Sequence, residues 1–280
     1  MTPKAINDLV RLALKEDAAG HDITTLNTVS AKATCRAAIV AGEKAIVCGT
    51  QLAAAAFRQL DSRTRVRIHT ADGKPVVRGQ TVLEISAKIR AVLSAERTAL
   101  NLLGYASGIS TLTRSYTRAA GRKDVAILDT RKTLPGLRDL ARLAVRTGGG
   151  VNHRLNLAEM VMIKDNHRAV LGRRTLAEVI HQIRKSSRKK IIIEVDNLNQ
   201  FKEALAAKPD IILLDNMTPA RLRQAVQLKH RLKSRAALEA SGGINLKTVR
   251  RTAQTGVDRI SIGALTHSAP GINFSLEIIS

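Results

Sequence analysis

Apolar positions in the first 120 or so residues change spacing several times, and these changes predict a small mixed α+β unit. Apolar residues three and four apart follow Thr2 and Pro3, which suit the start of a helix. Strand-like runs lie between the later helical stretches. The expected helices cover residues 2–14, 52–60 and 89–118, and the expected strands cover 36–40, 44–47, 65–70 and 81–86. We expect the last helix to be interrupted near Gly104 and Gly108.

A different pattern follows, in which short continuous apolar runs alternate with helix-like stretches. The runs cover residues 125–128, 160–163, 191–193, 211–214, 236–238 and 260–262, and the helical stretches cover 137–147, 176–185, 199–207, 219–232 and 246–255. Continuous apolar strands between helices are typical of a parallel sheet that helices cover. The pattern therefore predicts an open α/β sheet or a (β/α) barrel, and periodicity alone does not separate the two.

Reactive or anion-binding groups follow or end all six apolar runs. These groups are Asp129, Lys164, Glu194, Asp215, the segment Ser241-Gly242-Gly243, and Gly263. In α/β barrels, the catalytic face lies at the carboxyl ends of the strands. A single strand often ends in a polar residue where it meets solvent. Because all six runs end in this way, the pattern favours a barrel-type enzyme.

The composition is that of a folded protein with a large excess of positive charge. Of the 280 residues 44% are hydrophobic and 2% aromatic, and the formal net charge is +23. No apolar run reaches the roughly 18 residues of a membrane-spanning helix. The first residues lack the apolar core of a secretory signal, and Cys35 and Cys48 have no metal-binding or C-x-x-C spacing. We therefore expect a cytoplasmic protein with two reduced cysteines.

The positive charge is spread along the chain. Residues 1–140 carry +10 and residues 141–280 carry +13. Such a charge attracts anions in general, including nucleic acid, membranes and small phosphorylated substrates. The low aromatic content disfavours single-stranded nucleic acid, which stacks on aromatic side chains.

Basic residues between positions 131 and 164 indicate a substrate with several anionic groups. They are Arg131, Lys132, Arg138, Arg142, Arg146, His153, Arg154 and Lys164. Arg138, Arg142 and Arg146 share one helix face and fit a solvated surface, whereas the others lie at strand ends and in loops. Arginine binds carboxylates through two hydrogen bonds, and lysine supplies a point charge. His153 alone could be a structural residue, but its position beside Arg154, after three glycines, favours binding.

Two carboxylates and two glycine segments complete the candidate chemistry. Glu194 and Asp215 end neighbouring runs, so they would either hold Mg²⁺ beside bound phosphates or balance nearby cations. Ser241-Gly242-Gly243 and Gly263 leave backbone N–H groups accessible, which is typical of a phosphate site.

Longer blocks of sequence around these residues resemble the quinolinate phosphoribosyltransferase family. The blocks Asp-Thr-Arg-Lys-Thr at 129–133 and Ile-Lys-Asp-Asn-His at 163–167 are long and highly specific. Further matching blocks lie at residues 96–101, 148–154, 214–216, 239–243 and 263–267. The resemblance extends over nearly the whole chain.

The resemblance implies the fold and the assembly. The fold would be an N-terminal α/β sandwich domain over residues 1–105, completed by about 266–280, and an incomplete parallel (β/α) barrel over residues 106–265. The partner would be a second copy of the chain, in a homodimer with shared active sites or in a higher oligomer. Neither nucleic acid nor a membrane is an expected partner.

The resemblance also implies the activity. Quinolinate would react with phosphoribosyl pyrophosphate to give nicotinate mononucleotide, pyrophosphate and CO₂ in de novo NAD biosynthesis, with Mg²⁺ as cofactor. The catalytic residues would be Lys132, Lys164, Glu194 and Asp215, of which Glu194 and Asp215 would hold the metal. The substrate-binding residues would be Arg97, which reaches into the partner's site, Arg131, Lys132, His153, Arg154, Lys164, Ser241, Gly242, Gly243, Gly263 and His267.

Four residues depart from the usual family pattern, although none belongs to the implied site. They are Ala87, Asn156, Glu159 and Asn273. Two other hypotheses stay open. One is a paralogue of the same fold that is linked to molybdenum uptake and takes another anionic substrate, and the other is a basic nucleic-acid-associated protein, which the net charge alone supports.

Overall fold

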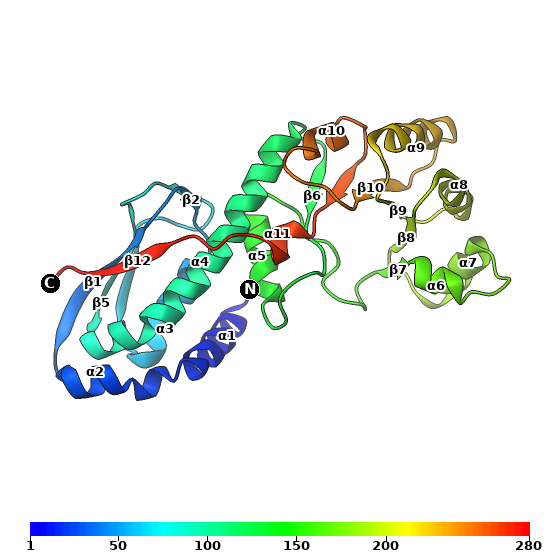
Figure 1. The fold of residues 1–280 in the computed structure, drawn as a ribbon. Coiled ribbons are helices and arrows are strands. Elements are labelled where there is room, and N and C mark those ends of the chain that lie inside the picture. Colours follow the sequence, from blue (N-terminus) through cyan, green and yellow to red (C-terminus); the bar gives the residue numbers. More distant parts are fainter. The chain divides into compact units, whose positions relative to one another are not determined.

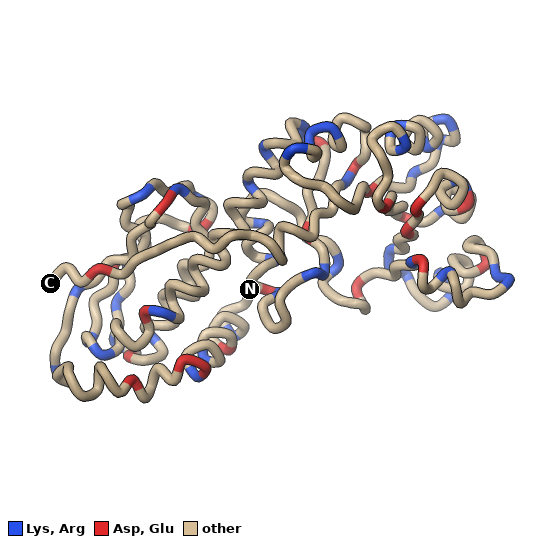
Figure 2. Tube along the Cα trace, in the orientation of Figure 1, with Lys and Arg blue, Asp and Glu red and all other residues tan.

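The computed structural model describes all residues from 1 to 280, and their contacts divide the chain into two compact units (Figure 1). Unit 1 comprises residues 1–114, 134–149 and 268–280, and unit 2 comprises residues 115–133 and 150–267. Lys and Arg recur along both units, as the even spread of charge in the sequence predicts (Figure 2). No helix is long and apolar enough to cross a membrane.

Unit 1 is built on an antiparallel sheet with the strand order β12-β1-β5-β3. These strands are β1 (Thr34–Ala41), β3 (Arg65–Ile68), β5 (Thr81–Lys88) and β12 (Phe274–Ile278). The strand expected over residues 44–47 is shorter, because β2 (Ala45–Ile46) pairs only with β4 (Pro75–Val76). The helices are α1 (Pro3–Glu16), η1 (Ala19–His21), α2 (Ile23–Thr28), α3 (Thr50–Leu60), α5 (Arg138–Thr147) and α4 (Ile89–Ala120), whose residues after Arg114 belong to unit 2.

Local sequence explains two of these helices. Thr2 caps α1, because its hydroxyl accepts the Ala5 N–H at 3.2 Å, and Pro3 occupies the first turn. The alanine-rich α3 is buried from Leu52 to Phe57. It contacts α1 together with β3 and β5, so its small side chains form much of the core of unit 1.

The predicted interruption of the long helix is wrong, because α4 is continuous from Ile89 to Ala120. Gly104 and Gly108 serve close packing instead. A Cβ atom on Gly104 would lie 2.6 Å from the carbonyl oxygen of Ile272, and one on Gly108 would overlap the carbonyl of Pro270. The two glycines therefore allow the backbone of residues 270–272 to lie directly against the helix.

Unit 2 is built on a six-stranded parallel sheet with the order β6-β11-β10-β9-β8-β7. Its strands are β6 (Ala126–Leu128), β7 (Val161–Ile163), β8 (Ile191–Val195), β9 (Ile211–Asp215), β10 (Ala237–Ser241) and β11 (Arg259–Ser261). The edge strands β6 and β7 do not pair with each other, so the barrel is incomplete. The predicted fold class is thereby confirmed.

Helices connect these strands as the sequence pattern predicts, with small differences. They are α6 (Asp165–Ala169), α7 (Leu176–Ser186), α8 (Leu198–Ala207), α9 (Pro219–Arg231), α10 (Val249–Ala253) and α11 (Ala264–His267). The helix expected over residues 246–255 is shorter at both ends. Asn245 starts it with a turn in which the Thr248 N–H donates to the Asn245 carbonyl. The short helices α6 and α11 were not predicted, because four or five residues hold too little periodicity.

Candidate active site

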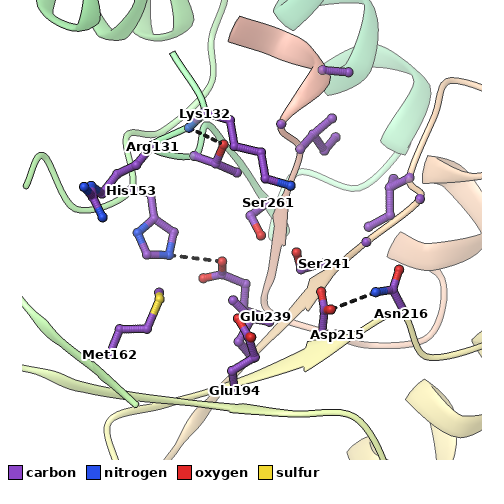
Figure 3. Close-up of a pocket in the computed structure, with 18 of the residues that line it drawn as sticks. Arg131, Lys132, His153, Met162, Glu194, Asp215, Asn216, Glu239, Ser241 and Ser261 are labelled. Atoms are coloured by element: carbon purple, nitrogen blue, oxygen red, sulfur yellow. Dashed lines mark hydrogen bonds and ion pairs between the residues drawn. The ribbon is translucent and has the colours of Figure 1, made fainter. Parts of the chain in front are cut away.

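A pocket of about 670 Å³ opens at the carboxyl ends of the strands in unit 2 (Figure 3). The predicted site residues that line it are Arg131, Lys132, His153, Arg154, Lys164, Glu194, Asp215, Ser241, Gly242, Gly243, Gly263 and His267. These residues are far apart in the sequence. The parallel topology gathers them, because all except His267, the last residue of α11 (Ala264–His267), stand near the end of a strand or in a loop that follows one.

Two arginines give one part of the pocket a strong positive charge. Arg154 is only 7% exposed, and its Nη1 donates to the Met160 carbonyl at 3.0 Å. Burial, together with the nearby charge of Arg131, lowers the pKa of Arg154 from its usual value. The Nε of Arg131 is buried without a hydrogen-bond partner. Because buried donors are normally paired, this arrangement suits an anionic ligand with two acceptor groups.

Lys132 extends into the pocket from the loop after β6 (Figure 3). Its backbone N–H donates to Thr130 Oγ1 at 3.1 Å, and its carbonyl accepts from Thr266 Oγ1 at 2.8 Å. These bonds tie the loop to α11. A Cβ atom on Gly263 would lie 3.1 Å from Lys132 Cδ. Glycine at this position therefore leaves room for the lysine side chain.

Glu194 and Asp215 stand on the adjacent strands β8 and β9, as the sequence predicts. Lys164 Nζ lies 3.0 Å from Glu194 Oε2, and Asp215 Oδ2 accepts from Asn216 Nδ2 at 2.7 Å. No group of three or more His, Cys, Asp or Glu side chains forms a complete metal site. Magnesium often takes one or two carboxylates with substrate oxygens, and Glu194 and Asp215 fit this smaller donor set. The contact with Lys164 fits the charge-balance interpretation equally well.

The loop after β10 depends on glycine. Gly242 and Gly243 have φ angles of +91° and +60°, in the left-handed region that glycine adopts without strain. A Cβ atom on Gly242 would lie 2.5 Å from Asn216 Cγ and 2.9 Å from the Asn216 backbone nitrogen. Glycine thus lets the loops after β9 and β10 approach each other. It also leaves the loop backbone open to an anionic group.

Glu239 is a pocket residue to which the sequence analysis gave no role. It is fully buried on β10, with Oε2 2.9 Å from Arg259 Nε and Oε1 3.2 Å from His153 Nε2. Burial alone would raise the pKa of Glu239, but the contacts with His153 and Arg259 outweigh it and hold the pKa below its usual value. Glu239 is therefore a buried carboxylate in an otherwise cationic part of the site.

Comparisons with known proteins agree with this arrangement of residues. Residues 22–107 match a family model for the N-terminal domain of quinolinate phosphoribosyl transferase, and residues 109–277 match the model for its C-terminal domain. The chain belongs to the quinolinate phosphoribosyl transferase family. The resemblance inferred from the sequence is confirmed.

Named relatives of this quinolinate phosphoribosyl transferase family member cover almost the whole chain. The nicotinate-nucleotide pyrophosphorylase [carboxylating] of Mycobacterium leprae is 39% identical over 278 residues, which are 98% of this chain and 97% of the relative. A probable enzyme of that name from Bacillus subtilis is 37% identical over 94% of this chain and 90% of its own. The crystal structure of NadC from Streptococcus pyogenes superimposes with a TM-score of 0.93 at 35% identity, covering 100% of this chain and 99% of that one.

Some predicted residues of this family member do not line the pocket. Arg97 is exposed on α4 in unit 1, so its contribution to the site of a second subunit stays a prediction. Arg138, Arg142 and Arg146 lie on α5 in unit 1, outside the pocket lining.

Other pocket residues of this family member were missed at the sequence level. They are Thr130, Met162, Leu213, Asn216, Glu239, Ile244, Ser261, Ile262 and Ala264. Four of them stand inside blocks that carry the family resemblance, which is the signal that could have identified them: Thr130, Asn216, Glu239 and Ala264. Met162, Leu213, Ile244 and Ile262 carry no such signal, because their residue types are those of any buried apolar segment.

Proposed function

We propose that this chain catalyses transfer of the phosphoribosyl group from phosphoribosyl pyrophosphate to quinolinate, with release of pyrophosphate and CO₂ and formation of nicotinate mononucleotide. The observation that carries the proposal is one pocket that combines paired guanidinium groups, a carboxylate pair and glycine loops. Quinolinate has two carboxylates, and phosphoribosyl pyrophosphate has several phosphate oxygens. Each substrate therefore has a complementary part of the site, and the family membership supports the same reaction.

Quinolinate would bind to Arg131, His153, Arg154 and Lys164. The buried Nε of Arg131 and the like charge of Arg154 favour a dianion between them, because a bound carboxylate would satisfy the donor and relieve the repulsion. Such binding would hold the ring nitrogen in a fixed direction. Orientation of two reactants is a major source of rate enhancement in bimolecular reactions.

The 5-phosphate of phosphoribosyl pyrophosphate would bind to Ser241, Gly242, Gly243, Gly263 and His267. Glu194 and Asp215 would hold the ribose hydroxyls and a Mg²⁺ ion. When bound, the ion supplies positive charge to the pyrophosphate leaving group. Lys164 would then share the Glu194 carboxylate, since the two side chains are already 3.0 Å apart.

The reaction would proceed by loss of pyrophosphate through an oxocarbenium-like state, with attack of the pyridine nitrogen on C1 of the ribose. The nitrogen becomes a pyridinium. The bond to the neighbouring carboxylate carbon then breaks, CO₂ leaves, and the electron pair on the ring carbon accepts a proton. Because the pyridinium stabilises that electron pair, the protein mainly supplies positioning and charge, with Lys132 close to the reacting carboxylate.

We also propose a homodimer in which Arg97 enters the site of the partner subunit, and a cytoplasmic location. Exposure of Arg97 on α4 supports the first proposal. The dimer is tested by light scattering and by mixing two inactive variants, Arg97→Ala and Lys132→Ala. If sites are shared, mixed dimers regain activity, whereas independent sites give none.

The activity is tested by incubating the protein with Mg²⁺, phosphoribosyl pyrophosphate and quinolinate labelled with ¹³C in the 2-carboxylate. We expect nicotinate mononucleotide and labelled CO₂ in equal amounts. Nicotinate is the control substrate, because it lacks the carboxylate that leaves. Lys132→Ala should be inactive in the same assay. Its matched control is Lys123→Ala, which changes an exposed lysine of unit 2 outside the pocket. Absence of both products at micromolar enzyme refutes the proposal and favours another anionic substrate.

A further inference from the structure

Glu239 needs an explanation because a carboxylate repels the anions that the pocket is expected to bind. It is 0% exposed, and His153, its neighbour in the pocket, is 5% exposed. The proposed reaction assigns Glu239 no chemical step. A fully buried charge is costly unless other groups pair with it, so its contacts indicate what it does.

The contacts form a chain of three side chains across unit 2. Glu239 Oε1 lies 3.2 Å from His153 Nε2 (Figure 3). Arg259 Nε donates to Glu239 Oε2 at 2.9 Å. Arg259 is on β11 and Glu239 on β10, opposite each other in the parallel register. The sheet therefore fixes the carboxylate, and the carboxylate faces one edge of the imidazole.

The other edge of the imidazole contacts the backbone. The Arg154 N–H donates to His153 Nδ1 at 2.7 Å. Nδ1 must then carry a lone pair, so a ring hydrogen is on Nε2, the nitrogen that lies 3.2 Å from Glu239 Oε1. Asp129 supports the same segment, because its Oδ1 accepts the His153 N–H at 2.6 Å. The backbone from which the Arg154 side chain projects is thus held through His153 on one side and Asp129 on the other.

We propose that Glu239 is a positioning residue that fixes the tautomer and ring plane of His153 and, through the Nδ1 contact, the place of Arg154 in the pocket. This inference rests on the proposed function, because it makes Glu239 a determinant of quinolinate binding. Glu239 touches neither substrate in this assignment. Its charge is matched by Arg259, so it orients His153 without opposing the anion.

The kinetic test is Glu239→Gln. A glutamine keeps the shape of the side chain but removes the negative charge that lies between His153 and Arg259. We expect the KM for quinolinate to rise roughly tenfold or more, the size expected when a buried contact with a charged group is lost. The KM for phosphoribosyl pyrophosphate should stay within about twofold, since the residues proposed for it do not depend on His153.

A matched control exists in unit 1. Glu84 on β5 is also held by one arginine and one histidine, Arg36 and His69. Glu84→Gln makes the same chemical change outside the pocket and should leave both KM values unchanged. In a His153→Ala background, Glu239→Gln should add little further loss, because Glu239 acts through His153. Fully additive losses would overturn the proposal.

A spectroscopic test needs no substrate. Long-range ¹H–¹⁵N spectra of the wild-type protein report the tautomer of each of its seven histidines. The His153 signal is assigned by its absence in His153→Ala, or in the more conservative His153→Gln if the alanine variant does not fold. We expect no hydrogen on Nδ1, because this nitrogen accepts the Arg154 N–H. A ring with hydrogen on Nδ1, neutral or charged, would overturn the proposal.

The two proposals fail in different ways. If the wild-type protein makes no nicotinate mononucleotide, the proposed function fails, whatever the spectra show. If the wild-type protein is active but Glu239→Gln leaves the KM for quinolinate unchanged, only the role of Glu239 fails.

Discussion

The glycine loop after β10 allows a sharp test of the phosphate site, because two adjacent glycines with positive φ angles differ in what an added side chain would meet. Gly242 and Gly243 both have positive φ angles. Alanine at either position therefore costs about 1–2 kcal/mol of backbone strain. A Cβ atom at Gly242 meets Asn216, whereas one at Gly243 meets no atom within 4 Å. The comparison of Gly242→Ala with Gly243→Ala separates the steric contact from the strain.

The size of the effect of Gly242→Ala can be worked out from the contact between the new Cβ atom and Asn216. Asn216 must move, which breaks the 2.7 Å hydrogen bond from its Nδ2 to Asp215 Oδ2. A hydrogen bond to a charged group contributes about 1.5–3 kcal/mol, which corresponds to roughly 10–150-fold in an equilibrium or rate ratio. We therefore expect kcat/KM for phosphoribosyl pyrophosphate to fall by roughly that factor more in Gly242→Ala than in Gly243→Ala.

The assay is initial-rate formation of nicotinate mononucleotide with phosphoribosyl pyrophosphate varied at saturating quinolinate, together with a thermal melt of each variant. The melting temperature should fall in both variants, and further in Gly242→Ala, which loses the Asn216 hydrogen bond in addition to carrying the backbone strain; the assays are therefore run well below both melting temperatures. The reasoning is refuted if the two variants have kcat/KM values within about twofold of each other.

Three further predictions concern the lysine proposed to be catalytic, a buried thiol and an ion pair. Lys132→Ala should lower kcat more than it changes KM for quinolinate, because Lys132 is assigned to the reacting carboxylate; a pure KM effect in steady-state kinetics would contradict that role. Burial raises the pKa of the Cys48 thiol to about 12, so iodoacetamide at pH 8 should label Cys48 only after the protein is unfolded. Labelling is measured by mass spectrometry, and labelling of Cys48 in the native protein at the rate of a free thiol would disprove this prediction. Contacts with Arg36 and His69 lower the pKa of Glu84 below its ordinary 4.5, so the stability that Glu84 adds is present above that pH and is lost as the pH falls below it. Urea unfolding of wild type and Glu84→Gln should therefore converge at acid pH, and a difference that stays constant from pH 3 to pH 7 would show the sign to be wrong.

The sequence contains enough information to locate the site but not to complete it. Parallel strands have a fixed direction, so a polar residue at the end of each apolar run necessarily reaches the same edge of the sheet. For this reason Lys164, Glu194 and Asp215 could be placed together from spacing alone. The family blocks then gave these residues roles that spacing could not give.

The features that escaped prediction depend on contacts between distant segments. Glu239 precedes a recognisable Ser-Gly-Gly segment, but its partners, His153 and Arg259, lie 86 residues before it and 20 after it. Nothing local identifies such a contact. Gly104 was misread for the same reason, since glycine in a helix indicates a break unless the backbone that packs against it is known.

The pairing of β12 with β1 has a consequence for the order in which the chain can fold. Ala37 on β1 finds its partner, Ile278 on β12, more than 200 residues later in the sequence. At a synthesis rate of about 5–20 residues per second, that edge of β1 waits on the order of ten to fifty seconds after its own synthesis. Unit 2 emerges complete during this interval, whereas unit 1 does not. All strands of the barrel, up to β11, are therefore made before β12, so the sheet whose first strand is made earliest is the last to be completed. The time for which the β1 edge is exposed is set by translation.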